Sequence, residues 1–370
     1  MVAGEEDQTR DTAGRCTMSE EGNVGVAPVR AGFAFDEVAL EQWMANNVTG
    51  FRGPISVQQF RGGQSNPTYH ISTPDRVYVL RRKPPGQLLK GAHAIEREAR
   101  VVQAVGGAGF PVPRIHGVCT DDSVIGSWFY VMDYVEGRIF WDASLSSLPI
   151  GERAGIWDAM NATIAQLHRI DYEAATLGDF GRPGNYFSRQ IDRWSQQYLA
   201  DGDAGRDSTM DRIIDRLRAA LPEGDDETSL THGDFRIDNI IFHPSEPRVL
   251  AVLDWELSTL GHPGSDFAYN AMMYRMPPEI VAGIGGRDPR MLGLPSEADY
   301  VAAYCARTDR PSLPNYDFYL AFNFFRLAAI FHGIKGRVVR GTASSAQAHE
   351  RVRVLPDLIA LAWEQLKRVA

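Results

Sequence analysis

The chain has 370 residues, of which 44% are hydrophobic and 23% charged, enough for two lobes or domains with sizeable cores. Its net charge of −9 argues against nucleic-acid binding as the main role, although local basic patches remain possible. Three cysteines without metal-ligand spacing disfavour a disulfide framework or a zinc site, and no apolar run approaches the ~18 residues of a membrane span.

The beginning of the chain predicts a tail and then a short helix. Residues 1–30 are rich in Gly, Glu, Asp, Thr and Arg and show little periodicity, so we expect a disordered tail. They also lack a signal-peptide core, and a cytoplasmic location is expected. Leu40, Trp43 and Met44 have the spacing of an amphipathic helix, for which Asp36 is the expected N-cap.

Three strands are predicted next, over residues 55–60, 68–72 and 77–81. A glycine-rich turn between the first two lets backbone N–H groups approach the phosphates of a nucleotide closely. Its candidate nucleotide-binding residues are Gly62, Gly63, Gln64, Ser65 and Asn66. An ordinary hairpin turn has the same composition, so both interpretations stay open.

The remaining chain predicts a helix over residues 92–105, two strands over 115–118 and 128–134, and then a largely helical part. Apolar residues at helix spacing predict helices over residues 151–167, 210–221, 297–307, 318–334 and 354–366, with a loop and helix over 178–198. Asp266 is expected to cap a helix, and residues 277–279 to start one.

Two acid-bearing turns lie beside apolar runs. The first, HGDFRIDN over residues 232–239, precedes the predicted buried strand 240–242. The second, DWE over residues 254–256, follows the predicted buried strand 249–253. The strands therefore fix Asn239 and Asp254, and Asp254 is expected on a rigid edge that faces a cleft.

These turns suit magnesium-dependent phosphoryl transfer. The reaction needs a carboxylate that orients and deprotonates the attacking hydroxyl, and oxygen ligands for the Mg²⁺ that bridges the nucleotide phosphates. Asp234 fits the first requirement, while Asn239 and Asp254 fit the second. A lone HGD could be a loop histidine and a cap, but the offsets of Asn239 and Asp254 favour catalysis. Glu256 is either a further member of the metal shell or a plain loop carboxylate.

The pattern HGDxxxxN, followed by a strand and DWE, resembles the aminoglycoside phosphotransferase and choline kinase family over most of the chain. The resemblance implies an α+β, two-lobed protein-kinase-like fold. A small N-terminal nucleotide-binding lobe with an antiparallel sheet would span residues 31–133, and a larger, mostly helical catalytic and substrate lobe residues 134–370. It also implies ATP and Mg²⁺ as cofactors, Asp234 as the catalytic base, and Asn239 and Asp254 as metal ligands.

The same resemblance implies three further site residues. Kinase-like folds place a cation on the third strand, where it neutralises phosphates and pairs with a helix carboxylate. Arg81 stands where most relatives have Lys, so whether Arg81 or the nearby Lys83 serves is left open. Glu98 is the implied partner of this cation, with a solvated helix face as the alternative. Met132 lies where the backbone that connects the lobes usually holds the adenine.

The acceptor is expected to be a small molecule with a hydroxyl group and a negative charge. Residues 318–349 contain no Asp or Glu but carry Arg326, Lys335, Arg337 and Arg340, whereas a polycationic aminoglycoside would need carboxylates. The strings GGQSNPTY, VLRRKPPG, HGDFRIDN and VLDWELSTLGHP resemble the kinase-like domain fused to acyl-CoA dehydrogenases in some eukaryotic proteins, a domain associated with phosphorylation of hydroxyacyl-CoA. The alternatives are an aminoglycoside O-phosphotransferase and a nucleotide-binding pseudokinase that acts as an interaction module, and these cations could also be solvated helix faces.

Overall fold

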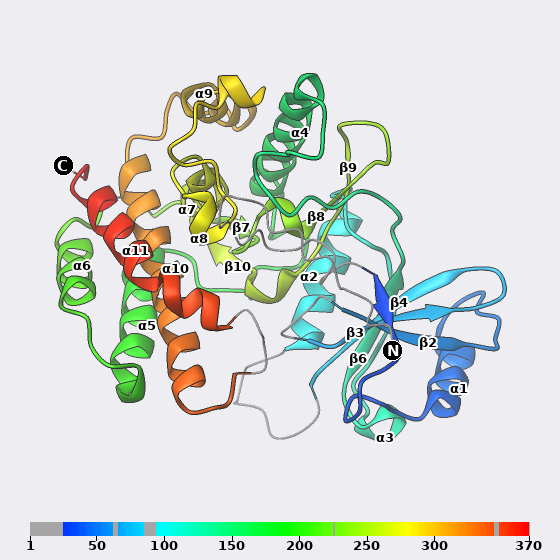
Figure 1. Cartoon of the computed structure of the whole chain (residues 1–370). Coiled ribbons are helices and arrows are strands. Elements are labelled where there is room, and N and C mark those ends of the chain that lie inside the picture. The colour runs from blue at the N-terminus through cyan, green and yellow to red at the C-terminus, as the bar shows by residue number, and fades with distance from the viewer. Residues whose placement is uncertain (1–24, 62–65, 85–93, 225, 344–347, 370) are drawn as a thin grey trace, which may run out of the picture.

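The structure, a computed structural model, describes residues 25–61, 66–84, 94–224, 226–343 and 348–369 (Figure 1). Within these residues an antiparallel sheet is followed by a larger, mostly helical part, which confirms the expected α+β kinase-like fold. The candidate nucleotide-binding residues Gly62, Gly63, Gln64 and Ser65 lie outside the described residues. No helix in the described part of the chain is long and apolar enough to cross a membrane.

The N-terminal part is a six-stranded antiparallel sheet with the strand order β1-β2-β3-β4-β6-β5. Its strands are β1 (Val26–Ala27), β2 (Ser56–Phe60), β3 (Thr68–Ser72), β4 (Val77–Arg82), β5 (Ile115–Cys119) and β6 (Phe129–Asp133). The accompanying helices are α1 (Glu37–Asn47), α2 (Ile95–Gly107) and α3 (Asp122–Ile125). The Asp36 side chain caps α1, as the sequence predicts, by accepting two backbone N–H groups.

The pleat of the sheet decides which side chains meet which helix, because successive residues of a strand point to opposite faces. Leu80 of β4 joins a buried cluster with Leu40 of α1. The next residue, Arg81, points to the other face, where Ile95 of α2 packs with Tyr130 of β6. The alternation of β4 thus directs the Arg81 guanidinium toward α2.

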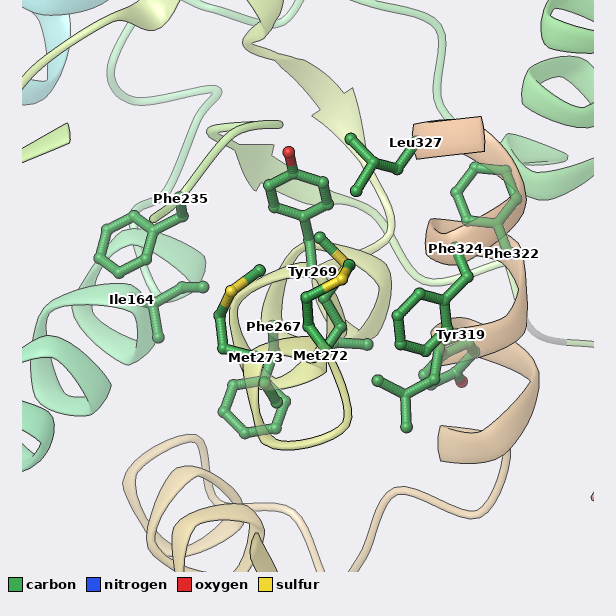
Figure 2. Packing of buried hydrophobic residues seen from close by; sticks show 14 of the residues in the cluster. Ile164, Phe235, Phe267, Tyr269, Met272, Met273, Tyr319, Phe322, Phe324 and Leu327 are labelled. Atoms are coloured by element: carbon green, nitrogen blue, oxygen red, sulfur yellow. The ribbon is translucent and has the colours of Figure 1, made fainter. Parts of the chain in front are cut away.

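The C-terminal part contains the larger hydrophobic core. Its helices are α4 (Ile150–His168), α5 (Tyr186–Ala200), α6 (Ser208–Ala219), α7 (Pro263–Ala271), α8 (Pro278–Val281), α9 (Glu297–Arg307), α10 (Tyr316–Val339) and α11 (Ala348–Leu366). Short 3₁₀ helices are η2 (Gly202–Ala204), η3 (Ile237–Asn239), η4 (Trp255–Leu257), η5 (Met272–Tyr274) and η6 (Arg290–Leu292). Helix α10 is buried along most of its length and packs against α11, α7 and α5 (Figure 1). Figure 2 shows its aromatic side chains beside Tyr269 and Met272.

Two short antiparallel ribbons carry the acid-bearing turns (Figure 1). Strand β7 (Ser229–Thr231) pairs with β10 (Thr259–Gly261), and β8 (Ile240–Phe242) pairs with β9 (Val249–Val252). The first turn connects β7 to β8, and the second connects β9 to β10. Both turns are therefore anchored at each end by strands that pair across the motif.

Two expectations about the chain ends need correction. The tail expected through residue 30 does not extend that far, because Val26 pairs with Phe60 and adds β1 to the sheet. Helix α11 begins at Ala348 rather than at residue 354, and Pro356 lies inside it. The earlier start matters for the site, since it places Arg351 on an ordered helix.

Candidate active site

The first acid-bearing turn depends on a glycine and a buried histidine. Gly233 has a φ of +83°, and a Cβ atom there would lie 2.7 Å from the carbonyl oxygen of Leu257. Nδ1 of His232 accepts the backbone N–H of Asp234 (3.2 Å), and its Nε2 donates to the carbonyl oxygen of Leu253 (2.9 Å). Both ring nitrogens of His232 are thus occupied in tying the first turn to the end of β9.

The Asp234 carboxylate accepts hydrogen bonds from three side chains. The Tyr269 hydroxyl (2.6 Å) and Nε of Arg236 (3.1 Å) donate to Oδ1, and the Asn239 amide donates to Oδ2 (3.1 Å). Burial by itself would raise the pKa of Asp234, but the charge of Arg236 and the Tyr269 hydrogen bond hold this pKa below its ordinary value. Asp234 is therefore an oriented carboxylate that stays ionised at neutral pH.

The pairing of β8 with β9 brings Asn239 and Asp254 to the same end of the ribbon. Ile240 lies opposite Val252, and the N–H of Leu253 donates to the carbonyl oxygen of Asn239 (2.8 Å). Asp254 then adopts a left-handed conformation with a φ of +66°, which is uncommon outside glycine and turns the chain directly after the strand. The two acid-bearing turns are thus adjacent in space.

Arg81 connects the sheet, α2 and the second turn. Its Nε lies 3.0 Å from the Glu98 carboxylate, and its Nη2 lies 2.6 Å from Oδ1 of Asp254. The side chains of Arg81 and Glu98 are only 10% and 3% exposed. Burial would lower the pKa of Arg81, but Glu98 and Asp254 raise it overall, so the guanidinium stays charged. Burial raises the pKa of Glu98 even though Arg81 opposes the shift.

Lys83, the alternative cation, has other partners. Its Nζ lies 3.1 Å from the Glu96 carboxylate and 3.8 Å from the centre of the Trp128 ring. The Glu96 side chain is 43% exposed. Arg81 and not Lys83 therefore faces the second acid-bearing turn.

The expectation that Asp266 caps a helix is wrong. His262 is the N-cap of α7, since its side chain accepts a backbone N–H of the first helical turn. The buried Asp266 carboxylate instead accepts the backbone N–H groups of His232 and Gly233, each at 2.8 Å, and contacts Nε2 of His168 (3.2 Å). Burial would raise the pKa of Asp266, but His168 lowers it overall. The ionised carboxylate therefore holds the backbone of the first turn in place.

Two arginines lie directly against the first turn. Arg236 lies 3.1 Å from the carboxylates of both Asp234 and Asp238. The buried Arg326 of α10 donates to the carbonyl oxygen of Gly233 (2.6 Å) and lies 5.1 Å from the centre of the Tyr269 ring. A residue of the last third of the chain thus contributes positive charge beside the first turn.

A third arginine, Arg351, approaches from α11. Burial lowers the pKa of Arg351 and the charge of Arg236 lowers it further, whereas Asp234 raises it, so the three groups lie within electrostatic reach of one another. Arg340, one of the cations singled out by the sequence, lies elsewhere and pairs with Asp201 (2.7 Å). The basic residues near the first turn are therefore only partly those that the sequence suggests.

The other candidate residues line the edge of this region. The amide of the buried Asn66 lies 3.5 Å from Oε2 of Glu256, and the same carboxylate lies 3.8 Å from Arg81. Met132 is half-buried near the end of β6, opposite Val79 of β4. Glu256 therefore links the second turn to the start of β3 and to the guanidinium.

Sequence reasoning missed three residues at the site. Arg236 had a detectable signal, because it stands within the first motif, two residues after Asp234. Tyr269 lies 35 residues from Asp234, and Arg351 lies still farther along the chain. In Figure 2 the hydroxyl of Tyr269 points away from the apolar side chains of α7 and η5. Only the folded chain shows that this hydroxyl reaches the carboxylate.

The side chains at the junction of the two turns fit a magnesium ion. Mg²⁺ in phosphotransferases is held by one or two protein oxygens together with substrate phosphates and water. The Asn239 amide and the Asp254 carboxylate provide such oxygens at one end of the β8–β9 ribbon. Among the described residues there is no cluster of three His, Cys, Asp or Glu side chains that would hold a metal without help from a substrate.

The fold and the site define the chain as a kinase-like phosphotransferase. Proteins of that class share a sheet and a helix joined by a buried ion pair, as Arg81 and Glu98 join β4 to α2 here. They also have acidic turns on short ribbons within the helical part, where Asp234, Asn239 and Asp254 lie in this chain. The sequence profile of the phosphotransferase enzyme family (APH) matches residues 56–322, and the chain belongs to this family.

Individual relatives and solved structures are also similar to this chain. The chain is 44% identical over 340 residues to acyl-CoA dehydrogenase family member 10 of Mus musculus, which covers 91% of this chain but only 32% of that protein. It is 49% identical to a putative aminoglycoside phosphotransferase from Ralstonia eutropha JMP134, whose crystal structure matches with a TM-score of 0.83 over 91% of this chain and 100% of that chain. A thermostable mutant of aminoglycoside phosphotransferase APH(4)-Ia, in a ternary complex with AMP-PNP and hygromycin B, matches 90% of this chain and 97% of its own with a TM-score of 0.57. At 14% identity this last likeness shows the fold alone.

Proposed function

We propose that the chain transfers the γ-phosphoryl group of ATP, with Mg²⁺, to a hydroxyl group of a small anionic metabolite such as a hydroxyacyl-CoA. The observation that carries the anionic acceptor is the gathering of Arg236, Arg326 and Arg351 around the first turn. The crystallisation of APH(4)-Ia with AMP-PNP supports ATP as the donor. The relationship to an acyl-CoA dehydrogenase family member supports an acyl-CoA as the acceptor.

The proposed base is Asp234. Its carboxylate is oriented by Tyr269 and Asn239, so it can accept a hydrogen bond from the acceptor hydroxyl and take its proton as the new O–P bond forms. Arg236 contacts the same carboxylate and would place positive charge beside the transferred group. These three neighbours together keep the base charged and in one position.

The proposed nucleotide-binding residues lie around the second turn, where Arg81 contacts Asp254. Arg81 would contact the nucleotide phosphates, and Glu98 would orient it through the buried ion pair. Asn239 and Asp254 would hold Mg²⁺, which when bound neutralises the charge on the phosphates. Asn66 would lie near the phosphates, and the backbone at Met132 would contact the adenine.

The charge of the site separates two classes of acceptor. Arg236 is paired with Asp234 and Asp238, but Arg326 and Arg351 make no ion pair with a carboxylate among the described residues, and their charge would weaken the binding of a polycationic aminoglycoside. An acyl-CoA carries several phosphates that such groups attract. The likeness to a putative aminoglycoside phosphotransferase keeps an aminoglycoside as the second candidate.

The test is Mg²⁺-dependent turnover of ATP with a panel of hydroxyacyl-CoA thioesters and a panel of aminoglycosides. We expect turnover with the thioesters and none with Asp234→Ala, which removes the base. Turnover restricted to aminoglycosides would refute the anionic acceptor. ATP binding without turnover on either panel would instead favour a pseudokinase.

A matched pair of arginine variants tests the acceptor site. Arg351→Ala should raise the KM for the acceptor about tenfold and leave the KM for ATP nearly unchanged, since it removes a charge on the acceptor side. Arg340→Ala removes an arginine that is paired with Asp201, away from the first turn, and should change neither constant. Equal effects of the two variants would contradict the proposed acceptor site.

A further inference from the structure

A second basic region lies beside α2. A hollow of about 350 Å³ opens between α2, the start of α5 and β10. Its lining includes the side chains of Arg97, Arg182, Arg189, Gln190, Thr259 and Asp179. We call this feature the arginine hollow. None of its residues belongs to the two acid-bearing turns.

The three guanidinium groups of the arginine hollow have no carboxylate partner among the described residues. Arg97 donates to the carbonyl oxygens of Phe180 and Ser258 and lies 3.7 Å from the centre of the Phe180 ring. Arg189 donates only to the carbonyl oxygens of Gly184 and Arg182.

The one carboxylate in the lining forms its ion pair with another arginine. Asp179 pairs with Arg100, which lies outside the lining. The Arg182 side chain makes no hydrogen bond or ion pair within the described part of the chain, and it is exposed. The hollow therefore has an excess of positive charge and free donor groups. Burial and the nearby Arg100 lower the pKa of Arg97, and Asp179 opposes the shift without reversing it, so the charged form of Arg97 would gain from a further anion placed beside it.

We propose that the arginine hollow binds the phosphate group of a small molecule. Planar guanidinium groups match the oxygens of a phosphate, and two or more of them around one hollow suit a dianion or a diphosphate better than a single carboxylate. The Thr259 hydroxyl and the Gln190 amide offer neutral donors to the same group. The volume admits a diphosphate together with part of the molecule that carries it.

The hollow is mechanically connected to the nucleotide side of the site. Arg97 precedes Glu98 on α2, and Glu98 pairs with Arg81. Arg97 also contacts the carbonyl oxygen of Ser258, in the chain that follows Asp254. An anion bound to Arg97 would therefore hold α2 against the second turn and stabilise the Arg81–Glu98 pair. The phosphate can belong to the acceptor itself or to a separate small molecule.

Isothermal titration of the full chain with pyrophosphate, without metal, tests the site. The nucleotide site is filled with AMP-PNP in a parallel series, because pyrophosphate could also bind there. We expect saturable binding that persists with AMP-PNP and weakens about tenfold in Arg182→Ala and further in Arg182→Glu. Arg182 is chosen because its side chain supports no described contact, so its loss should leave the fold intact.

Arg340→Ala is the matched control, since this arginine lines another hollow but is paired with Asp201 and Asp203. It should leave pyrophosphate binding unchanged. If no part of the pyrophosphate binding depends on Arg182, either with or without AMP-PNP, the proposal is overturned. This result does not depend on catalysis, so it is separable from the proposed function.

A second measurement, which rests on the proposed function, identifies the source of the phosphate. If the group belongs to the acceptor, pyrophosphate competes with a hydroxyacyl-CoA, and Arg182→Ala raises the KM for that acceptor. If it belongs to a separate molecule, pyrophosphate does not compete with the acceptor and lowers the KM for ATP. Either result is assigned to the arginine hollow only if Arg182→Ala abolishes the effect of pyrophosphate.

Discussion

The buried pair of Arg81 and Glu98 gives a sharp test of how the site is built. In Arg81→Met the Glu98 carboxylate would remain buried without its nearest cation, which costs about 3–5 kcal/mol of unfolding free energy. Glu98→Gln is milder, at about 1–2 kcal/mol, because Arg81 keeps Asp254 at 2.6 Å. The double variant has no buried unpaired charge, so it should be more stable than the sum of the single changes predicts, by about 2 kcal/mol.

The neighbouring pair of Lys83 and Glu96 is the control. Its N–O distance is 3.1 Å, against 3.0 Å for Arg81 and Glu98, so the two pairs differ mainly in burial. Lys83 and Glu96 are 21% and 43% exposed, and solvent-screened pairs contribute only about 0–1 kcal/mol. Lys83→Met, Glu96→Gln and their combination should therefore behave additively.

Urea unfolding followed by circular dichroism at pH 7 measures both cycles. The buried cycle should show coupling of about 2 kcal/mol and the exposed cycle almost none. A loss in Arg81→Met no larger than that in Lys83→Met, or equal coupling in the two cycles, would refute the reasoning that burial makes the Arg81–Glu98 pair structurally important.

Three further predictions concern the first acid-bearing turn. Tyr269→Phe removes the 2.6 Å hydrogen bond to Asp234, the proposed base. Steady-state kinetics should show kcat lowered about tenfold with little change in the KM for ATP. An unchanged kcat would exclude a role of Tyr269 in orienting Asp234. Gly233→Ala forces a left-handed φ and a 2.7 Å contact on alanine, and it should lower the unfolding free energy by about 2 kcal/mol in urea titrations. Gly286 has a φ of +80° with open space around it, so Gly286→Ala should lower the unfolding free energy less. Equal losses in the two variants would contradict a steric cause. Asp266 has a folded-state pKa below its unfolded value of about 3.9, so its stabilising contribution is complete above that pH and is lost as the pH falls through the folded pKa. The stability gap between wild type and Asp266→Asn should accordingly be largest at neutral pH and narrow below about pH 4 in urea titrations, and a gap that widens on acidification would show the sign to be wrong.

The strands and helices were largely readable from the sequence because they rest on local patterns. The alternation of Val77 to Arg81 predicts a strand, and β4 ends one residue later, at Arg82. Asp36 is the predicted cap of the first helix, and its side chain caps α1. Patterns of this kind work because side-chain period and capping depend on neighbours a few residues apart.

The sequence was less informative where a residue acts through a distant partner. Asp266 stands before an apolar run, which is typical of a cap, yet its carboxylate binds backbone N–H groups more than 30 residues earlier in the chain. Capping is a local property, whereas the choice between the two uses of a carboxylate depends on which backbone groups folding brings within reach. Sequence order alone does not carry that information.

By itself, then, the sequence determined the family and the kinase-like fold. It also singled out Asp234, Asn239 and Asp254 as candidate site residues, since short segments separate them within its motifs. The tertiary structure decided that Arg81 and not Lys83 faces the second turn, and that the Tyr269 hydroxyl contacts Asp234 in the first. The physical reason is distance along the chain. Contacts between residues 35 or more positions apart are set by how α7 packs against β7 and α10 against α7, and no local pattern records that packing.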